Sequence, residues 1–287
     1  MSELPKTDIL AEILETKRQE LRFDKKRSLR QALLDSPTGI IAEFKRKSPS
    51  KGWIHADARP EQVVPAYAAA GAAALSILTD EPYFGGSLEY IRQVRALVDI
   101  PILRKDFIID PVQLVEARQA GADAVLLIAA CLSRSACEAL TAEAHRLGLG
   151  VLLEIHSAEE LDYITPDIDV VGVNNRHLGS FVTDVRTSFD LAPQLMTLSD
   201  DDCRRRTAER KLVFRQTCPK NNFRPRVCKT PSAGNNSGMV FISESGLSDD
   251  GTVRSLREAG YRGFLMGENF MKNPDPGAAL ADFIRAL

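Results

Sequence analysis

The sequence predicts an α/β protein of the (β/α)8, or TIM barrel, class, with an N-terminal helical extension and one long basic insertion. Eight short apolar runs recur along the 287 residues, and a helix-like amphipathic stretch follows each of them. This alternation indicates parallel βαβ units, and eight units close a barrel. The runs are residues 40–44, 73–78, 101–105, 124–129, 150–155, 170–174, 239–243 and 263–267.

The chain before the first run predicts one or two amphipathic helices between Asp8 and Leu34. We assign residues 1–39 to this N-terminal helical extension and the whole of 1–287 to a single barrel domain. Two roles are open for the extension: it plugs the bottom of the barrel, or it covers a substrate.

Helix signals separate the runs. Stretches at 60–70, 111–120 and 248–259 begin with Pro or Ser and stop before Gly71, Gly121 and Gly260, as helix termini prefer. Residues 184–196 predict the sixth helix of the barrel.

The connection between the sixth helix and the seventh strand is too long for a barrel unit. Residues 199–238 show no sustained period and hold ten Lys and Arg against four Asp and Glu. A long segment without periodicity inside a compact domain is functional, disordered or a sign of a wrong assignment. We interpret it as a disordered insertion or a misread reading frame, with an ordered loop and a functional module as alternatives.

Composition limits the function classes. A net charge of −2 argues against a dedicated nucleic-acid or anionic-membrane binder. The N-terminus lacks the apolar core of a signal peptide, and no stretch predicts a membrane span, so we expect a cytoplasmic protein. Five cysteines without a C-x-x-C pair indicate neither a disulfide framework nor a metal site.

Polar residues stand at the C-terminal ends of six of the eight predicted strands, where barrels of this class carry their sites. Glu43 and Lys45, two residues apart, point the same way from the first strand. A solvated strand end would explain a polar residue at any one of these strands. Packing alone does not explain polar residues at the same end of six strands. The candidates are Glu43, Lys45, Ser48, Lys105, Glu154, Asn174, Arg176, Glu244, Ser245, Gly246, Gly267 and Glu268.

The loops after strands seven and eight predict a phosphate site. Glycine at 246 and 267 lets backbone N–H groups approach a phosphate, and helix starts favour anions. We therefore expect a small phosphorylated substrate.

Together these motifs resemble the indole-3-glycerol phosphate synthase family over nearly the whole chain. The resemblance is carried by IIAEFKRKSPSKG, PILRKDFIID, GADAVLLIAACL, LLEIHS, VGVNNRHL, VFISESGL and FLMGENFM. It implies ring closure of 1-(2-carboxyphenylamino)-1-deoxyribulose 5-phosphate, with loss of carbon dioxide and water, to indole-3-glycerol phosphate in tryptophan biosynthesis. It also implies a lyase without cofactor or metal, and we expect a monomer.

The resemblance assigns a role to each candidate residue. Lys105 matches the general acid that protonates the substrate carbonyl, and Glu154 matches the general base. The other matches are Lys45 and Ser48 near the anionic ends of the substrate, Glu43 and Asn174 orienting Lys105 and the substrate hydroxyls, Arg176 and Glu244 in supporting positions, and Ser245, Gly246, Gly267 and Glu268 in the phosphate loops.

Two expectations about neighbours of Lys105 follow. Phe107 either packs against the anthranilate ring or is a core aromatic beside the strand. Lys45 is a cation that lowers the pKa of Lys105 and so makes it a better acid.

Two alternatives to the active synthase remain. One is a non-catalytic barrel in which the 199–238 insertion prevents assembly of the phosphate loops. The other is a different phosphate-binding barrel, such as the isomerase of the preceding step, which the pairing of Lys105 with Glu154 disfavours.

Overall fold

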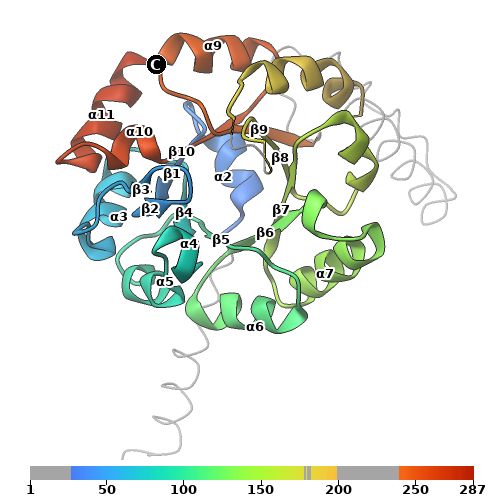
Figure 1. The fold of residues 1–287 in the computed structure, drawn as a ribbon, viewed down its shortest axis with the longest axis horizontal. Helices are drawn as coiled ribbons and strands as arrows, with labels where there is room; N and C mark the ends of the chain where they lie inside the picture. The colour runs from blue at the N-terminus through green and yellow to red at the C-terminus, as the bar shows by residue number, and fades with distance from the viewer. Residues whose placement is uncertain (1–26, 178, 180–181, 199–238) are drawn as a thin grey trace, which may run out of the picture.

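The computed structural model describes residues 27–177, 179, 182–198 and 239–287, and its strands close a parallel barrel (Figure 1). Each strand pairs with its neighbour in the chain, and β1 closes the ring by pairing with both β4 and β10. The (β/α)8 prediction is confirmed. The barrel strands are β1 (Ile40–Phe44), β4 (Ala74–Leu78), β5 (Ile102–Lys105), β6 (Ala124–Ile128), β7 (Gly150–Ile155), β8 (Val170–Asn174), β9 (Val240–Glu244) and β10 (Gly263–Met266).

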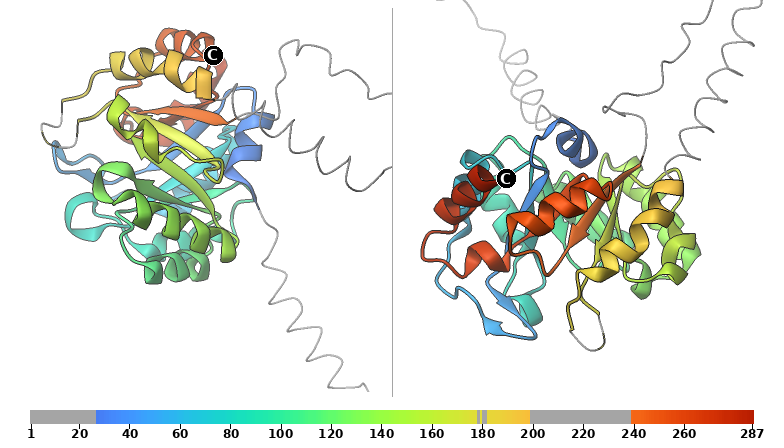
Figure 2. Two further views of the ribbon diagram at one scale, coloured as in Figure 1. Left: turned by 90° about the vertical axis from the view of Figure 1, so that its right-hand side faces the viewer. Right: turned by 90° about the horizontal axis from the view of Figure 1, so that it is seen from above.

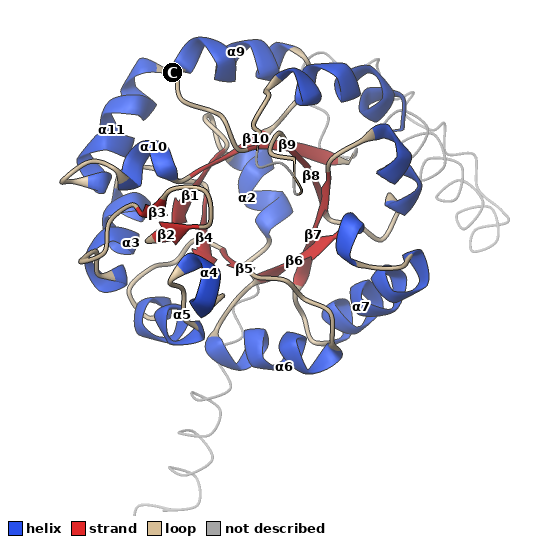
Figure 3. Cartoon of the chain, viewed as in Figure 1, coloured by secondary structure: helices blue, strands red, loops and turns tan. Residues whose placement is uncertain are grey.

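Helices surround the barrel as an outer layer (Figure 3). The predicted termini hold for α6, where Asp110 forms a capping box and Gly121 ends the helix with a φ of 97°. The helices are α3 (Pro60–Ala69), α4 (Glu81–Phe84), α5 (Leu88–Arg95), α6 (Pro111–Ala120), α7 (Arg134–Arg146), a helix over residues 186–198, α9 (Asp250–Glu258), α10 (Glu268–Met271) and α11 (Pro276–Ala286).

Two connections contain elements that were not predicted from the pattern of a helix-like stretch after each strand. After β1 the chain first forms an antiparallel hairpin of β2 (Lys47–Ser48) and β3 (Gly52–Trp53). After β7 it forms only a 3-10 segment, η3 (Ala158–Tyr163), which ends at Ile164, ahead of Pro166. A second 3-10 turn, η2 (Ala129–Cys131), leads from β6 towards α7.

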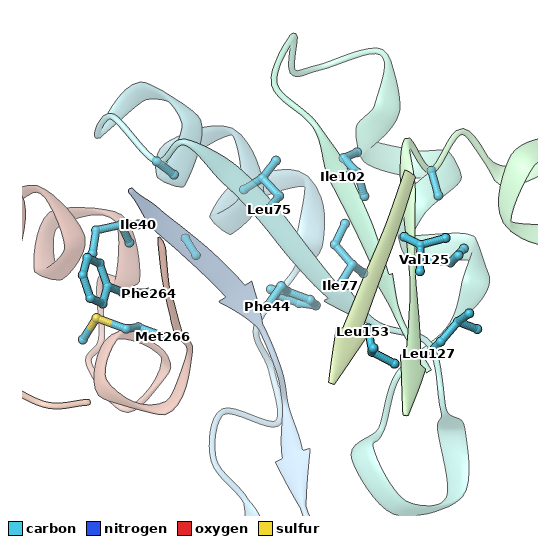
Figure 4. Packing of buried hydrophobic residues seen from close by; sticks show 14 of the residues in the cluster. Ile40, Phe44, Leu75, Ile77, Ile102, Val125, Leu127, Leu153, Phe264 and Met266 are labelled. Carbon is cyan, nitrogen blue, oxygen red and sulfur yellow. The ribbon is translucent and has the colours of Figure 1, made fainter. Parts of the chain in front are cut away.

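The main core lies between the strands and the helices. Figure 4 shows side chains of alternate strand positions in this layer, among them Ile77, Leu127 and Leu153. Because successive strand residues point to opposite faces, every second residue packs against the helices and the others fill the barrel interior.

The described part of the N-terminal extension closes one end of the barrel. In α2 (Leu29–Asp35), Leu29 and Leu33 are almost fully buried and pack with residues near the strand starts, such as Ile41 and Val240. The side views place α2 at the end of the barrel opposite the β2–β3 hairpin (Figure 2). For α2, the plug is therefore the correct alternative, and the substrate cover is not.

Residues 199–238 lie outside the described residues, so the disordered-insertion prediction is not tested by the fold. The described chain enters this segment from the helix at 186–198 and leaves it at the start of β9, the strand end opposite Glu244. Within the described ranges, no helix is long and apolar enough to cross a membrane.

Candidate active site

Lys105 occupies the centre of the C-terminal end of the barrel. Its Nζ donates to Glu154 Oε2 at 2.5 Å and to Glu244 Oε2 at 2.8 Å, which joins β5, β7 and β9. Both carboxylates are almost fully buried, at 2% and 1% side-chain exposure. The structure thus brings three of the predicted site residues into direct contact.

The expectation that Lys45 lowers the pKa of Lys105 is wrong. Burial lowers the pKa of Lys105, but the carboxylates of Glu154, Glu244 and Glu43 together outweigh burial and raise it. Lys45 instead forms an ion pair with Glu43, with 2.7 Å between Nζ and Oε1. Lys105 is therefore a protonated hydrogen-bond donor across the neutral pH range.

Glu154 is held in its ionised form. Asn174 Nδ2 donates to its Oε1 at 3.0 Å, and His156 Nε2 lies 3.3 Å from the same oxygen. Burial raises the pKa of Glu154, but Lys105 and then His156 outweigh burial, and the net shift is downward. A lowered pKa keeps this carboxylate ionised but weakens it as a base, so it must lie within hydrogen-bond reach of any proton that it removes.

Glu244 has a different environment, although it contacts the same lysine. Burial raises the pKa of Glu244 to about 7, because attraction to Lys105 only partly offsets burial and the charges of Glu154 and Glu43 add to it. Its Oε1 is buried without a hydrogen-bond partner among the described residues. Of the two carboxylates beside Lys105, Glu154 is thus ionised and Glu244 titrates near neutrality.

Two glycines make room for these carboxylates. A Cβ at Gly172 would lie 2.2 Å from Glu244 Oε1, and a Cβ at Gly267 would lie 2.8 Å from both Cβ and Oε1 of Glu43. Gly267 has an ordinary negative φ of −131°. Close packing against Glu43 is thus a reason for glycine at 267 that is independent of a phosphate role, and the phosphate role stays a prediction.

The loop after β9 has two consecutive residues in the left-handed region, Ser245 with a φ of 65° and Gly246 with a φ of 75°. A Cβ at Gly246 would approach Thr183 Cγ2 to 2.7 Å, so both the backbone and the packing require glycine there. After β10, the N–H groups of Glu268 and Asn269 precede the first hydrogen bond of α10, which the Phe270 N–H donates to the Gly267 carbonyl at 3.0 Å. Both loops present backbone donors, as a phosphate site needs.

The side chain of Glu268 connects the loops around this end. It pairs with Lys51 and lies 4.0 Å from Arg176 Nη2. Arg176 Nη1 also donates to Ser50 Oγ at 3.2 Å, so the loop after β1 is tied to the loop after β8. Ser48, in the same hairpin, is buried, and its hydroxyl has no hydrogen-bond partner among the described residues.

Phe107 is not a core aromatic, because 39% of it is exposed. Its ring centroid lies 6.2 Å from that of Phe84, and the two rings form an apolar pair that follows β4 and β5. Of the two readings of Phe107, the structure excludes burial in the core. Packing against an aromatic ring of the substrate stays a prediction.

Two residues of the site were not among the candidates. His156 stands two positions after Glu154, so strand alternation already placed it on the same face. Asn175 follows Asn174 and points the other way, into a buried polar cluster behind the β9 loop.

Among the described residues there is no group of three or more His, Cys, Asp and Glu arranged to hold a metal ion.

The model of the indole-3-glycerol phosphate synthase family matches residues 4–202. The chain belongs to this family. The indole-3-glycerol phosphate synthase of Bacteroides thetaiotaomicron is 50% identical over 98% of this chain and 99% of its own length. That of Azoarcus sp. strain BH72 is 41% identical over 84% of this chain and 77% of its own.

The match of the indole-3-glycerol phosphate synthase model ends at residue 202, close to the start of the predicted insertion at 199. A thiamine phosphate pyrophosphorylase structure from Pyrococcus furiosus superposes with a TM-score of 0.56 over 90% of this chain and 97% of its own, at 13% identity. At that identity, the likeness supports the barrel fold alone.

Proposed function

We propose that this protein catalyses the indole-3-glycerol phosphate synthase reaction, with Lys105 as the general acid and Glu154 as the general base. The substrate is 1-(2-carboxyphenylamino)-1-deoxyribulose 5-phosphate. The aromatic ring attacks the substrate carbonyl, carbon dioxide leaves from the ring carbon, and elimination of water gives indole-3-glycerol phosphate. Membership of the family and the contact of Lys105 with Glu154 and Glu244 are the observations that support this proposal most directly.

The acid role of Lys105 follows from its protonation. A lysine with a raised pKa keeps its proton over the working pH range and can donate a charged hydrogen bond to the carbonyl oxygen. Negative charge develops on that oxygen as the ring carbon attacks, and a fixed ammonium group in a buried site stabilises it. In this proposal, Lys105 acts mainly through its charge, and proton transfer completes the step.

The base role of Glu154 follows from its ionisation and neighbours. Its Oε1 faces Asn174 and His156, while its Oε2 faces Lys105. Glu154 can therefore remove a proton from the methylene carbon beside the substrate nitrogen during dehydration, and the departing hydroxyl takes up this proton and leaves as water.

The substrate's two anionic ends require cations or N–H donors at different places. Lys45 steadies the carboxylate until it leaves as carbon dioxide, with Glu43 holding Lys45 in place at 2.7 Å. The hydroxyl of Ser48 and the guanidinium of Arg176 lie in the same group of loops. The N–H groups around Gly246 and Gly267 bind the phosphate.

As part of this proposal, the enzyme is a monomer and works in the cytoplasm. All proposed site residues come from the strand ends of one barrel, so catalysis requires no second chain. A mass near 31.6 kDa in light scattering after size exclusion supports the monomer, and twice that mass contradicts it.

The Lys105→Met variant tests the function. Methionine keeps most of the volume and removes the charge, so we expect turnover to fall by a factor on the order of 10³ or more. Substrate binding, followed by equilibrium titration, should persist. Lys272→Met, an exposed position at the end of α10, is the matched control and should retain wild-type turnover. Wild-type rates in Lys105→Met would exclude the assigned acid.

A further inference from the structure

The buried side chain of Asn175 holds the loop after β9 from behind. Its Nδ2 donates to the carbonyl oxygens of Glu244 and Ser245, each at 3.0 Å. Its own backbone N–H also donates to the Glu244 carbonyl at 2.9 Å. Asn175 is only 3% exposed, so it does not reach the open face of the site.

The orientation of the Asn175 amide is fixed by the groups around it. Its Oδ1 accepts from the backbone N–H of Ser188 at 3.1 Å and from the Ser188 hydroxyl at 2.8 Å. Its Nδ2 also reaches Ser243 Oγ at 3.0 Å. Donors on one side and carbonyl oxygens on the other allow one orientation of the amide only.

This anchoring sets the direction of a backbone donor. In a planar trans peptide, the carbonyl of one residue and the N–H of the next point in opposite directions. Because the Ser245 carbonyl points at Asn175, the N–H of Gly246 points away from the buried cluster. No residue in the described part of the chain accepts a hydrogen bond from that N–H.

The same contact holds an unfavourable backbone conformation. Ser245 has a φ of 65°, which costs a non-glycine residue about 1 kcal/mol or more. Such a conformation persists only where the surroundings determine it. The bond from Asn175 Nδ2 to the Ser245 carbonyl supplies that constraint from behind.

We infer that Asn175 is a positioning residue for the substrate's phosphate group, acting through Ser245 to aim the Gly246 N–H at a phosphate oxygen. This inference rests on the proposed function, since it takes the phosphate to bind at the loops after β9 and β10. Asn175 itself touches no part of the substrate. Its effect is on phosphate affinity and not on the chemistry at Lys105.

The variants Asn175→Asp and Asn175→Ser test this role. Aspartate keeps the shape but places an acceptor opposite two carbonyl oxygens, and serine retains one hydroxyl donor in case aspartate prevents folding. We expect KM for the phosphorylated substrate, and the inhibition constant of inorganic phosphate, to rise together by about tenfold, as loss of directed hydrogen bonds predicts. We expect kcat to stay within about twofold of wild type.

Tyr261→Phe is the matched control. The Tyr261 hydroxyl donates to the Ser188 carbonyl at 2.7 Å, at the far end of the same buried cluster. Its loss lowers stability without touching the carbonyls of the β9 loop, so KM and phosphate inhibition should remain at wild-type values.

Three results would separate the possibilities. Folded Asn175 variants with unchanged KM and unchanged phosphate inhibition overturn the inference, as does an equal effect of Tyr261→Phe. A wild-type protein that binds inorganic phosphate but does not convert the substrate overturns the proposed function. In that case, loss of phosphate binding in the Asn175 variants, measured by calorimetry, still supports the positioning role.

Discussion

The carboxylate of Glu244 on β9 extends over Gly172 on the neighbouring strand β8, and it fits only because residue 172 has no side chain. A Cβ there would approach Glu244 Oε1 to 2.2 Å, far inside van der Waals contact. The strands themselves cannot separate, since β8 and β9 are paired over their full lengths. A methyl group at 172 must therefore displace the carboxylate.

Gly172→Ala should accordingly reduce kcat by about ten- to a hundredfold, because Lys105 loses one of its two contacts with a carboxylate. The double variant Gly172→Ala with Glu244→Asp shortens the opposing side chain and should recover part of the loss. A double-mutant cycle measures this coupling. Additive losses in kcat would show that the two residues act independently.

His156 lies between two carboxylates, with Nε2 3.3 Å from Glu154 and Nδ1 3.5 Å from Glu160. Burial lowers the pKa of His156, but these two carboxylates outweigh burial and raise it to about 9. A histidine whose pKa is raised on folding stabilises the fold fully below its unfolded pKa, and that contribution is lost as pH rises through the folded value.

His156→Gln should therefore lower the free energy of unfolding more at about pH 6 than at about pH 10, as measured by urea denaturation. The variant also removes a cation from Glu154, so the acidic limb of the kcat/KM profile should move to higher pH. His145→Gln, which changes the contact of His145 Nε2 on the outer helix α7 with Asp169 Oδ2 at 2.8 Å, is the control for the activity profile. An unmoved acidic limb would argue against the coupling of His156 to Glu154.

At the scale of single elements, α2 shows how a short helix outside the βαβ repeat completes the core. Leu29 and Leu33 seal the strand starts, while Gln31 on the same helix is exposed. The helix is capped by Ser28, whose hydroxyl accepts from the Gln31 N–H. Its burial, and not its length, keeps it in place.

Leu33→Ala should reduce the free energy of unfolding by ~2–5 kcal/mol, because it leaves a cavity against a rigid barrel end. Activity below the unfolding transition should persist, since the site lies at the opposite end. Gln31→Ala on the exposed face should change stability by less than about 0.5 kcal/mol. Thermal and chemical denaturation distinguish the two variants.

Element by element, sequence reasoning succeeded where a residue's neighbours in the chain determine its environment. Strand alternation placed Glu43 beside Lys45, and Gly121 marked the end of α6. It failed at η3, where a 3-10 segment that ends ahead of Pro166 takes the place of the expected helix. It also missed Asn175, because the partners of that side chain come from β9 and the helix at 186–198, distant in sequence.

The electrostatics of the site could not be predicted from the sequence for a similar reason. Whether the pKa of Lys105 is lowered by Lys45 or raised by the carboxylates depends on which groups are in contact across the barrel. The structure places Glu154 and Glu244 at 2.5 Å and 2.8 Å from Lys105 Nζ, while Lys45 is engaged by Glu43. The sign of the pKa shift follows from those distances.

At the scale of the whole molecule, the segment 199–238 joins the barrel at the end opposite the proposed catalytic residues. β9 begins at Val240, and Glu244 stands at its other end, about 13 Å away along an extended strand. The non-catalytic alternative, in which the segment disturbs the phosphate loops, is not favoured by any observation on the described residues.

Replacing residues 199–238 with a flexible linker of about ten Gly and Ser residues should leave kcat/KM within about threefold of wild type. The yield on refolding should rise, because a shorter connection costs less loop-closure entropy. A steady-state assay and refolding from urea measure these two effects. A loss of activity in a folded variant would assign a functional role to the segment.

The pairing of β1 with β10 has a consequence for synthesis on the ribosome. Ile40 is in register with Phe264, more than 200 residues further along the chain. The second edge of β1 therefore stays uncovered until β10 has been synthesised. Until then, the nascent chain carries an apolar strand with one open edge, which is a site for non-native pairing. Closure of the barrel is thus a late event after translation of β10, and the exposed β1 edge defines the interval in which the chain is most vulnerable to aggregation.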